Sequence, residues 1–180
     1  MKIRGFEVVS RYQHKGINLP QRQTKNAAGY DFECAEDFLI PSIWHYDFIR
    51  IFHLLRNHRH LTDDDFKRAS DTLKSFLVPT GIKAYMQPNE VLILAERSSN
   101  PLKRNLILPN GIGVIDADYY NNVTNEGEIF VQLINYGPRD RIIHKGERIA
   151  QGIFMPYLTV DNEKPIINER KGNFGSTDTD

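Results

Sequence analysis

The stretch GIGVIDADYYNN, residues 111–122, is the most informative part of the chain, because an apolar run ends there among polar groups. The run at residues 112–115 has the character of a buried strand. It stops at Asp116, and Tyr119 and Tyr120 follow soon after. A turn in solvent explains this pattern without chemistry. A functional site explains it differently, as a strand that delivers a carboxylate and two phenols to one place.

Short apolar runs separated by Gly, Pro or Asn lie on both sides of this stretch. They predict strands at residues 6–9, 28–34, 81–85, 91–95, 106–108, 112–115, 129–134 and 149–155. Closely spaced short strands with turn residues between them are typical of a β barrel or jelly roll. The sequence therefore predicts a mainly β protein.

One segment has helical rather than strand periodicity. Large apolar residues at positions 44, 48, 51, 52 and 55 share one helix face, and apolar residues at 66, 69, 73, 76 and 77 share another. Thr62 is placed as an N-cap, with Asp65 in the capping-box position. Residues 43–77 are therefore predicted to form two antiparallel helices, an insertion that packs on the outer barrel wall. About 35 residues are few for an independent core, so residues 1–180 are predicted to be one domain.

Composition excludes several classes of protein. Lys plus Arg and Asp plus Glu are both 23, and this zero balance argues against broad nucleic-acid binding. The single cysteine, Cys34, permits no disulfide within the chain, which fits a reducing cytoplasm. No apolar run approaches the roughly 18 residues of a membrane span, and the N-terminus has no signal-peptide core. A cytoplasmic location is expected.

Five short motifs stand out, and each alone also fits a turn, a strand or a chain end. They are AGYDFECA (28–35), ERSSN (96–100), NGIGVIDADYY (110–120), KGERIAQG (145–152) and ERKGNFGSTD (169–178). In this order and spacing they resemble the trimeric dUTPase family, in the form found in Gram-positive bacteria and their phages. The resemblance covers nearly the whole chain except the helical insertion.

This resemblance implies a jelly-roll-like β barrel that assembles as a homotrimer with three active sites at subunit interfaces. It also implies hydrolysis of dUTP to dUMP and pyrophosphate by water attack on the α-phosphate. That reaction limits uracil incorporation into DNA and supplies dUMP for thymidylate synthesis. No membrane or direct nucleic-acid partner is expected.

The resemblance assigns the central motif to base, sugar and water. Asp116 matches the catalytic aspartate that activates the attacking water, since water at neutral pH is a poor nucleophile. Tyr119 matches the tyrosine that packs on deoxyribose and excludes a 2′-hydroxyl by a steric clash. Asn110, Gly113 and Ile115 match the positions at the uracil, within a hairpin spanning residues 110–119.

The resemblance assigns three other motifs to the triphosphate. Arg97, Ser98 and Ser99 match the phosphate-binding motif that crosses a subunit boundary, and Gln151 matches a glutamine that faces the phosphates. Asp31 matches the aspartate that holds a water on Mg²⁺, an ion that keeps several waters and takes phosphate oxygens as ligands. Mg²⁺ is the one cofactor expected.

The C-terminal motif resembles the family's flexible lid, here residues 169–180. Phe174 matches the aromatic residue that stacks on uracil, and Arg170 matches the arginine that reaches the γ-phosphate. Three further residues are assigned to close contact with the ligand: Gly175, Ser176 and Thr177. Closure of such a segment excludes water and completes a site.

Two other functions compete with this interpretation. A dCTP deaminase shares the fold and an Arg-Ser-Ser motif, but would lack the FGST stretch and would use a glutamate in place of Asp116. A nucleotide-sensing regulatory protein would keep the site and bind a repressor, with the helical insertion as the candidate surface for a protein partner.

Overall fold

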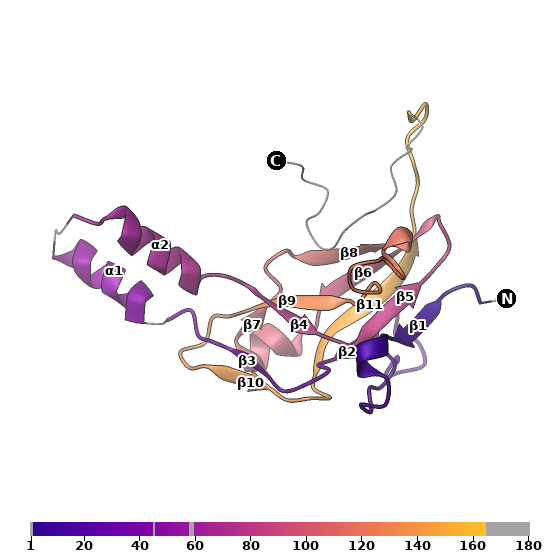
Figure 1. The fold of residues 1–180 in the computed structure, drawn as a ribbon, viewed down its shortest axis with the longest axis horizontal. Helices are drawn as coiled ribbons and strands as arrows, with labels where there is room; N and C mark the ends of the chain where they lie inside the picture. The colour runs from indigo at the N-terminus through magenta and orange to yellow at the C-terminus, as the bar shows by residue number, and fades with distance from the viewer. Residues whose placement is uncertain (1, 45, 58–59, 165–180) are drawn as a thin grey trace.

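The computed structural model describes residues 2–44, 46–57 and 60–164, and its body is a barrel of short strands (Figure 1). The strands are β1 (Gly5–Val8), β2 (Tyr30–Glu33), β3 (Phe38–Ile40), β4 (Phe76–Pro79), β5 (Ile82–Tyr85), β6 (Glu90–Glu96), β7 (Leu106–Ile107), β8 (Ile112–Asp116), β9 (Phe130–Asn135), β10 (Arg141–Ile143) and β11 (Arg148–Pro156). The prediction of a mainly β fold is confirmed. The described helices include none that is long and apolar enough to cross a membrane.

The strands pair antiparallel in four sheets. A four-stranded sheet has the order β2-β11-β6-β8, and a three-stranded sheet has the order β4-β9-β7. The pairs β1-β5 and β10-β3 complete the arrangement. Neighbours in each sheet are mostly distant in sequence, as expected when strands cross between sheets of a jelly roll.

The core lies between these sheets and is filled by one alternate set of side chains from each strand. In the four-stranded sheet this inward face carries Leu92, Leu94 and Ile115, each at most 2% exposed. Gly152 lies on the same face, where an added Cβ would be 2.6 Å from the ring of Phe32. The outward face carries the other alternate set, which includes three of the candidate site residues, Asp31, Asp116 and Gln151.

Two helices interrupt the β fold: α1 (Tyr46–Arg56) and α2 (Asp63–Thr72). The predicted capping box is confirmed, because Thr62 Oγ1 accepts from Asp65 N at 3.2 Å and Asp65 Oδ2 accepts from Thr62 N at 3.1 Å. The predicted end of the second helix is wrong. Phe76 and Leu77 belong to β4, where they pair with β9. Their apolar side chains fit the helical spacing of the sequence, but both residues belong to a strand.

The helical hairpin projects from one end of the barrel, which corrects the prediction that it packs on the outer wall (Figure 1). The Trp44 indole, assigned to the helix face by periodicity, instead donates to the carbonyl of Tyr136 at 2.9 Å. Asp140 Oδ1 accepts from the backbone N of Ser42 at 2.8 Å. These contacts fix the base of the hairpin. Several apolar side chains beyond it are about half exposed: Ile49, Phe52, Leu55, Phe66 and Leu73.

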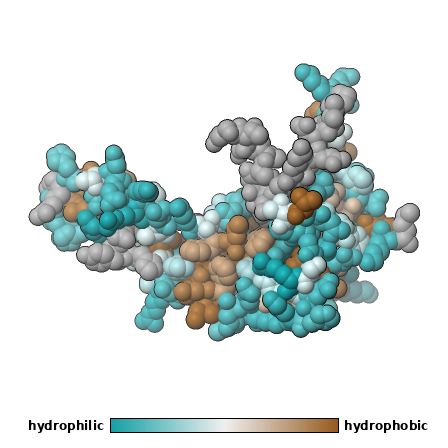
Figure 2. Space-filling model, viewed as in Figure 1, coloured by the Kyte–Doolittle hydropathy of each residue, from teal (hydrophilic) through white to brown (hydrophobic). Residues whose placement is uncertain are grey.

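Hydrophobic surface also gathers over the middle of the barrel, whereas the hairpin is largely hydrophilic in this view (Figure 2). On the outward face of the four-stranded sheet, Ile112, Val114 and Met155 are each about half exposed. Exposed apolar side chains that gather on one face mark interaction sites in soluble proteins.

Candidate active site

Asp116 is the last residue of β8, so the strand carries its carboxylate to the rim of the barrel. It pairs with Val91 of β6, and a 3-10 turn at Ala117–Tyr119 follows at once. A cleft of about 520 Å³ opens there. Its lining is Met86, Pro88, Asp116, Ala117, Asp118 and Tyr157. The apolar strand therefore ends in a carboxylate that faces a cleft.

The segment before Asp116 is not a hairpin, which corrects the prediction for residues 110–119. A tight turn at Asn110 and Gly111 leads into β8, with Gly111 at a φ of 70°. Within the described residues β8 pairs with β6, and β7 pairs with β9. Apolar patterning identified the strand, but could not identify its partner.

The three predicted uracil positions lie differently in this segment. Asn110 is exposed at the turn. Gly113 is buried, and an added Cβ would lie 3.2 Å from Leu94 Cβ. Ile115 is 2% exposed in the core, so its side chain is enclosed and does not face a ligand.

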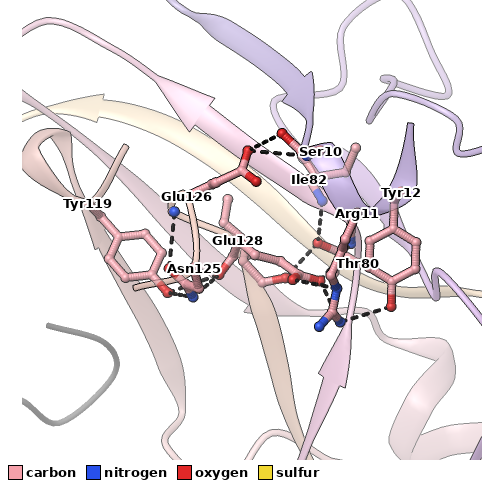
Figure 3. Close-up of polar contacts among 12 residues, drawn as sticks. Ser10, Arg11, Tyr12, Thr80, Ile82, Tyr119, Asn125, Glu126 and Glu128 are labelled. Atoms are coloured by element: carbon pink, nitrogen blue, oxygen red, sulfur yellow. Dashed lines mark hydrogen bonds and ion pairs between the residues drawn. The ribbon is translucent and has the colours of Figure 1, made fainter. Parts of the chain in front are cut away.

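Tyr119 is the last residue of the 3-10 turn that follows Asp116, and it is 3% exposed. Figure 3 shows its polar contacts. Its hydroxyl donates to the carbonyl of Glu128 at 2.9 Å and accepts from Asn125 Nδ2 at 2.8 Å. The phenol is therefore fixed by polar contacts rather than free to rotate.

A second group of site residues meets around Asp31 on β2. Its Oδ1 accepts from Arg97 Nε at 3.0 Å, and its Oδ2 accepts from Arg148 Nη1 at 3.1 Å. The Asp31 side chain is 11% exposed, and that of Arg97 is 19% exposed. Ser99 Oγ accepts from Arg97 Nη1 at 3.4 Å, and Ser98 is exposed beside it. Two guanidiniums and two hydroxyls thus gather at one corner of the sheet.

Gln151 belongs to the same corner, because it pairs with Asp31 across the β2–β11 ladder. Its Nε2 donates to the carbonyl of Glu96 at 3.0 Å. Burial raises the pKa of the Glu96 carboxyl above its ordinary value. Gly29 permits this packing, since an added Cβ would lie 2.5 Å from Gln151 Oε1.

The Asp31 carboxylate is compatible with water-mediated Mg²⁺ binding. An ionised carboxylate has about four acceptor positions, and the two arginines use two of them. The remaining positions can accept from waters on a cation, as the water-rich coordination of Mg²⁺ requires. The described residues contain no group of three or more His, Cys, Asp or Glu arranged to hold a metal directly.

The two groups of site residues are separated within one chain. Asp116 and Gln151 lie on the same outward face, but at opposite ends of the sheet. The predicted lid residues, Arg170 and Phe174 to Thr177, lie outside the described residues.

Three residues of the site were not assigned a role from sequence. Arg148 shares Asp31 with Arg97, although it lies within the quoted KGERIAQG motif and three residues before Gln151. Asp118 lies within the central motif and Tyr157 lies outside all five motifs, and both line the Asp116 cleft. The strand predicted at residues 149–155 runs toward the Asp116 end of β6. Extending that prediction by two residues would have placed Tyr157 near the site.

Comparison with known proteins agrees with this geometry. A family model described as dUTPase matches residues 65–179. The chain is 46% identical over 178 residues to a deoxyuridine 5′-triphosphate nucleotidohydrolase of Lactococcus lactis, covering 98% of this chain and 99% of that protein. It superimposes on the crystal structure of a dUTPase from Streptococcus mutans with a TM-score of 0.68 and 41% identity, covering 88% of this chain and 99% of that one.

A more distant structure shares the fold alone. The dUTPase from phage phi11 of S. aureus is 16% identical with a TM-score of 0.61, over 93% of this chain and 97% of that one. The order of the motifs, the barrel and the extent of these matches agree with one another. The chain belongs to the dUTPase family.

Proposed function

We propose that this protein hydrolyses dUTP to dUMP and pyrophosphate at active sites shared between the subunits of a homotrimer. Membership of the dUTPase family supports the reaction, and the related Lactococcus protein is a dUTP nucleotidohydrolase rather than a deaminase. The observation that most directly supports this active site is that Asp116 ends a strand and lines a cleft.

In this proposal Asp116 orients and deprotonates the attacking water. The reaction at phosphorus needs a positioned nucleophile and cations around the equatorial oxygens. Arg97 supplies a fixed guanidinium: its Nε donates to Asp31, its Nη1 donates to Ser99 Oγ and to the carbonyl of Arg148, and its Nη2 is assigned to a phosphate. Ser98, Ser99 and Gln151 add neutral donors. Asn110 and the backbone around Gly113 and Ile115 serve the uracil.

Mg²⁺ neutralises charge on the phosphate oxygens when it is bound. The contribution of this chain would be Asp31, whose carboxylate could accept from a water on the bound ion while Arg97 and Arg148 fix it in place.

The outward face of the four-stranded sheet supports trimer formation. Ile112, Val114 and Met155 leave apolar surface exposed between the two groups of site residues. Covering this face with neighbouring chains would bury that surface and bring the Asp116 of one chain toward the Arg97 of another. The lid residues Arg170, Phe174, Gly175, Ser176 and Thr177 would then close over a bound nucleotide.

The helical hairpin supports a second, separate role in binding a protein partner. Phe52, Leu55 and Phe66 are each more than half exposed in the described chain. Such apolar surface on a projecting element suits a partner, whose identity the hairpin does not reveal. The expected cytoplasmic location remains a prediction and is compatible with the buried free thiol of Cys34.

Pyrophosphate release tests the proposed reaction. The protein should release pyrophosphate from dUTP and lose activity when EDTA removes Mg²⁺, with recovery on Mg²⁺ addition. Turnover of dTTP, dCTP and UTP should be far lower. In this proposal Tyr119 packs on the deoxyribose and excludes a 2′-hydroxyl. Comparable turnover of UTP would contradict that contact, and full activity in EDTA would contradict the metal assignment.

A further inference from the structure

The hydroxyl of Tyr119 is held in a closed set of three hydrogen bonds (Figure 3). It donates to the carbonyl of Glu128 at 2.9 Å. Asn125 Nδ2 donates to the same hydroxyl at 2.8 Å and to the same carbonyl at 3.3 Å. With both its donor and an acceptor position used, the phenol has one preferred orientation.

Asn125 is itself held by its own loop. Its Oδ1 accepts from Gly127 N at 3.0 Å and from Asn122 Nδ2 at 2.8 Å. Asn122 Nδ2 also donates to the backbone carbonyl of Tyr119 at 3.0 Å. The loop therefore holds Tyr119 at both ends, through its backbone and through its hydroxyl.

The loop is anchored to the barrel independently of Asn125. The Glu126 carboxylate accepts from the backbone N and the Oγ of Ser10, at 3.2 and 2.9 Å. The buried Glu128 carboxylate lies 3.2 Å from Arg11 Nε and accepts from Gly81 N at 3.3 Å. These segments lie far from the loop in sequence, so the loop should keep its path when the Asn125 side chain is removed.

We propose that Asn125 is a positioning residue for sugar discrimination, acting through Tyr119. This inference rests on the proposed contact between Tyr119 and the deoxyribose. A ring that excludes a 2′-hydroxyl by steric clash must resist displacement, because a ring that yields admits the larger sugar. The hydrogen bond from Asn125 adds resistance at the hydroxyl end of the ring. The specificity of this site for deoxyribose therefore depends in part on a side chain that touches no substrate.

The test compares Asn125→Ala with Val123→Ala, a control in the same loop whose side chain is 93% exposed. For each protein kcat/KM is measured with dUTP and with UTP, and Tm is recorded. Asn125→Ala should reduce the ratio of the dUTP value to the UTP value by about 5- to 10-fold, the size expected for losing the hydrogen bond at the Tyr119 hydroxyl, one of several that the Asn125 side chain makes. Val123→Ala should leave the ratio unchanged. A purely structural role for Asn125 would lower Tm and affect both substrates equally, and that result would overturn the proposal.

Tyr119→Phe provides a second test that keeps the ring and removes the hydroxyl. It should reduce the ratio by a similar factor, and Asn125→Ala should have no further effect on the ratio in that background. Additive effects would overturn the proposal, as would an unchanged ratio in Tyr119→Phe. Tyr119→Ala separates the contact of Tyr119 with the sugar from the positioning role of Asn125. If Tyr119→Ala leaves the dUTP-to-UTP ratio unchanged, Tyr119 does not contact the sugar. If Tyr119→Ala lowers the ratio but Asn125→Ala does not, Tyr119 contacts the sugar and only the role of Asn125 is overturned.

Discussion

Asp116 and Gln151 flank the same strand on the same face, but they pair with it at residues four positions apart, Val91 and Ala95. At about 3.3 Å per residue this offset is roughly 13 Å along the sheet, and two strand spacings add roughly 10 Å across it. A water activated by Asp116 must lie within about 3 Å of the carboxylate. The Asp116 and Gln151 of one chain are therefore too far apart to act on the same α-phosphate.

Complementation between inactive chains follows from this separation. Asp116→Asn and Arg97→Ala should each be nearly inactive alone, and subunit exchange between them should restore activity. After random exchange of equal amounts of the two variant chains, about one quarter of the shared sites should contain both a wild-type Asp116 and a wild-type Arg97. Activity is measured as pyrophosphate release after exchange, with mass spectrometry to verify hybrid trimers. Verified hybrids without activity would mean that both residues serve sites within one chain.

The carboxylate of Asp116 should be needed for rate rather than for binding. Asp116→Asn keeps the shape of the side chain but removes the base, so kcat should fall on the order of 10²-fold or more with little change in substrate affinity. Asp118→Asn is the matched control, because Asp118 lines the same cleft. It should retain kcat within a few-fold. A larger loss in Asp118→Asn than in Asp116→Asn would exchange the roles of the two carboxylates.

Much of the fold was predictable because inward and outward side chains alternate along strands such as β6 and β8. The Thr62 cap was also predictable, since its contacts are local. The pairing of β8 with β6 was not, because the partners are distant in sequence. The same limit applies to Arg148, which reaches Asp31 only after β11 pairs with β2. Motifs identify residue types and order, whereas sheet register decides which of them meet.

The buried carboxyl of Glu128 should make stability depend on pH. Burial raises its pKa, an effect that the Arg11 charge opposes in part. The folded-state pKa lies above the ordinary value of 4.5, so the folded state binds the proton more tightly than the unfolded chain. The stability from this group is fully present below the ordinary pKa and is lost as pH rises through the folded-state pKa. The free energy of unfolding of the wild-type protein, relative to that of Glu128→Gln, should therefore decrease as the pH rises.

Glu126→Gln is the control for this pH dependence and should show the opposite slope. Hydrogen bonds from the backbone and side chain of Ser10 lower the pKa of Glu126. Its contribution is present above the ordinary pKa and is lost as pH falls through the folded-state pKa. Urea unfolding from about pH 3 to 8 measures both slopes. Equal slopes in the two variants would show that burial does not set the titration of Glu128.

The helical hairpin should be dispensable for catalysis. Its helices, α1 and α2, contact one another, and its base is fixed by Ser42 and Trp44. Replacing residues 46–73 with a short Gly-Ser linker keeps that base and leaves β4 intact. The variant should form a folded trimer with dUTP turnover close to that of the full-length protein, because no residue assigned to the site lies in the replaced segment. Size-exclusion chromatography with light scattering gives the oligomeric state, and pyrophosphate release gives the activity.

Trp44 provides the control for this replacement, since it is the one tryptophan of the chain and its indole donates to Tyr136. Unchanged tryptophan fluorescence in the variant would show that the base of the hairpin is intact. The hydroxyl of Tyr136 donates to the carbonyl of Pro101, directly after the Arg97 motif, so a damaged base could disturb the phosphate corner indirectly. An intact base and trimer with lost activity would instead mean that the helices reach an active site, on the same or a neighbouring subunit, and would overturn their assignment as a separate projecting element.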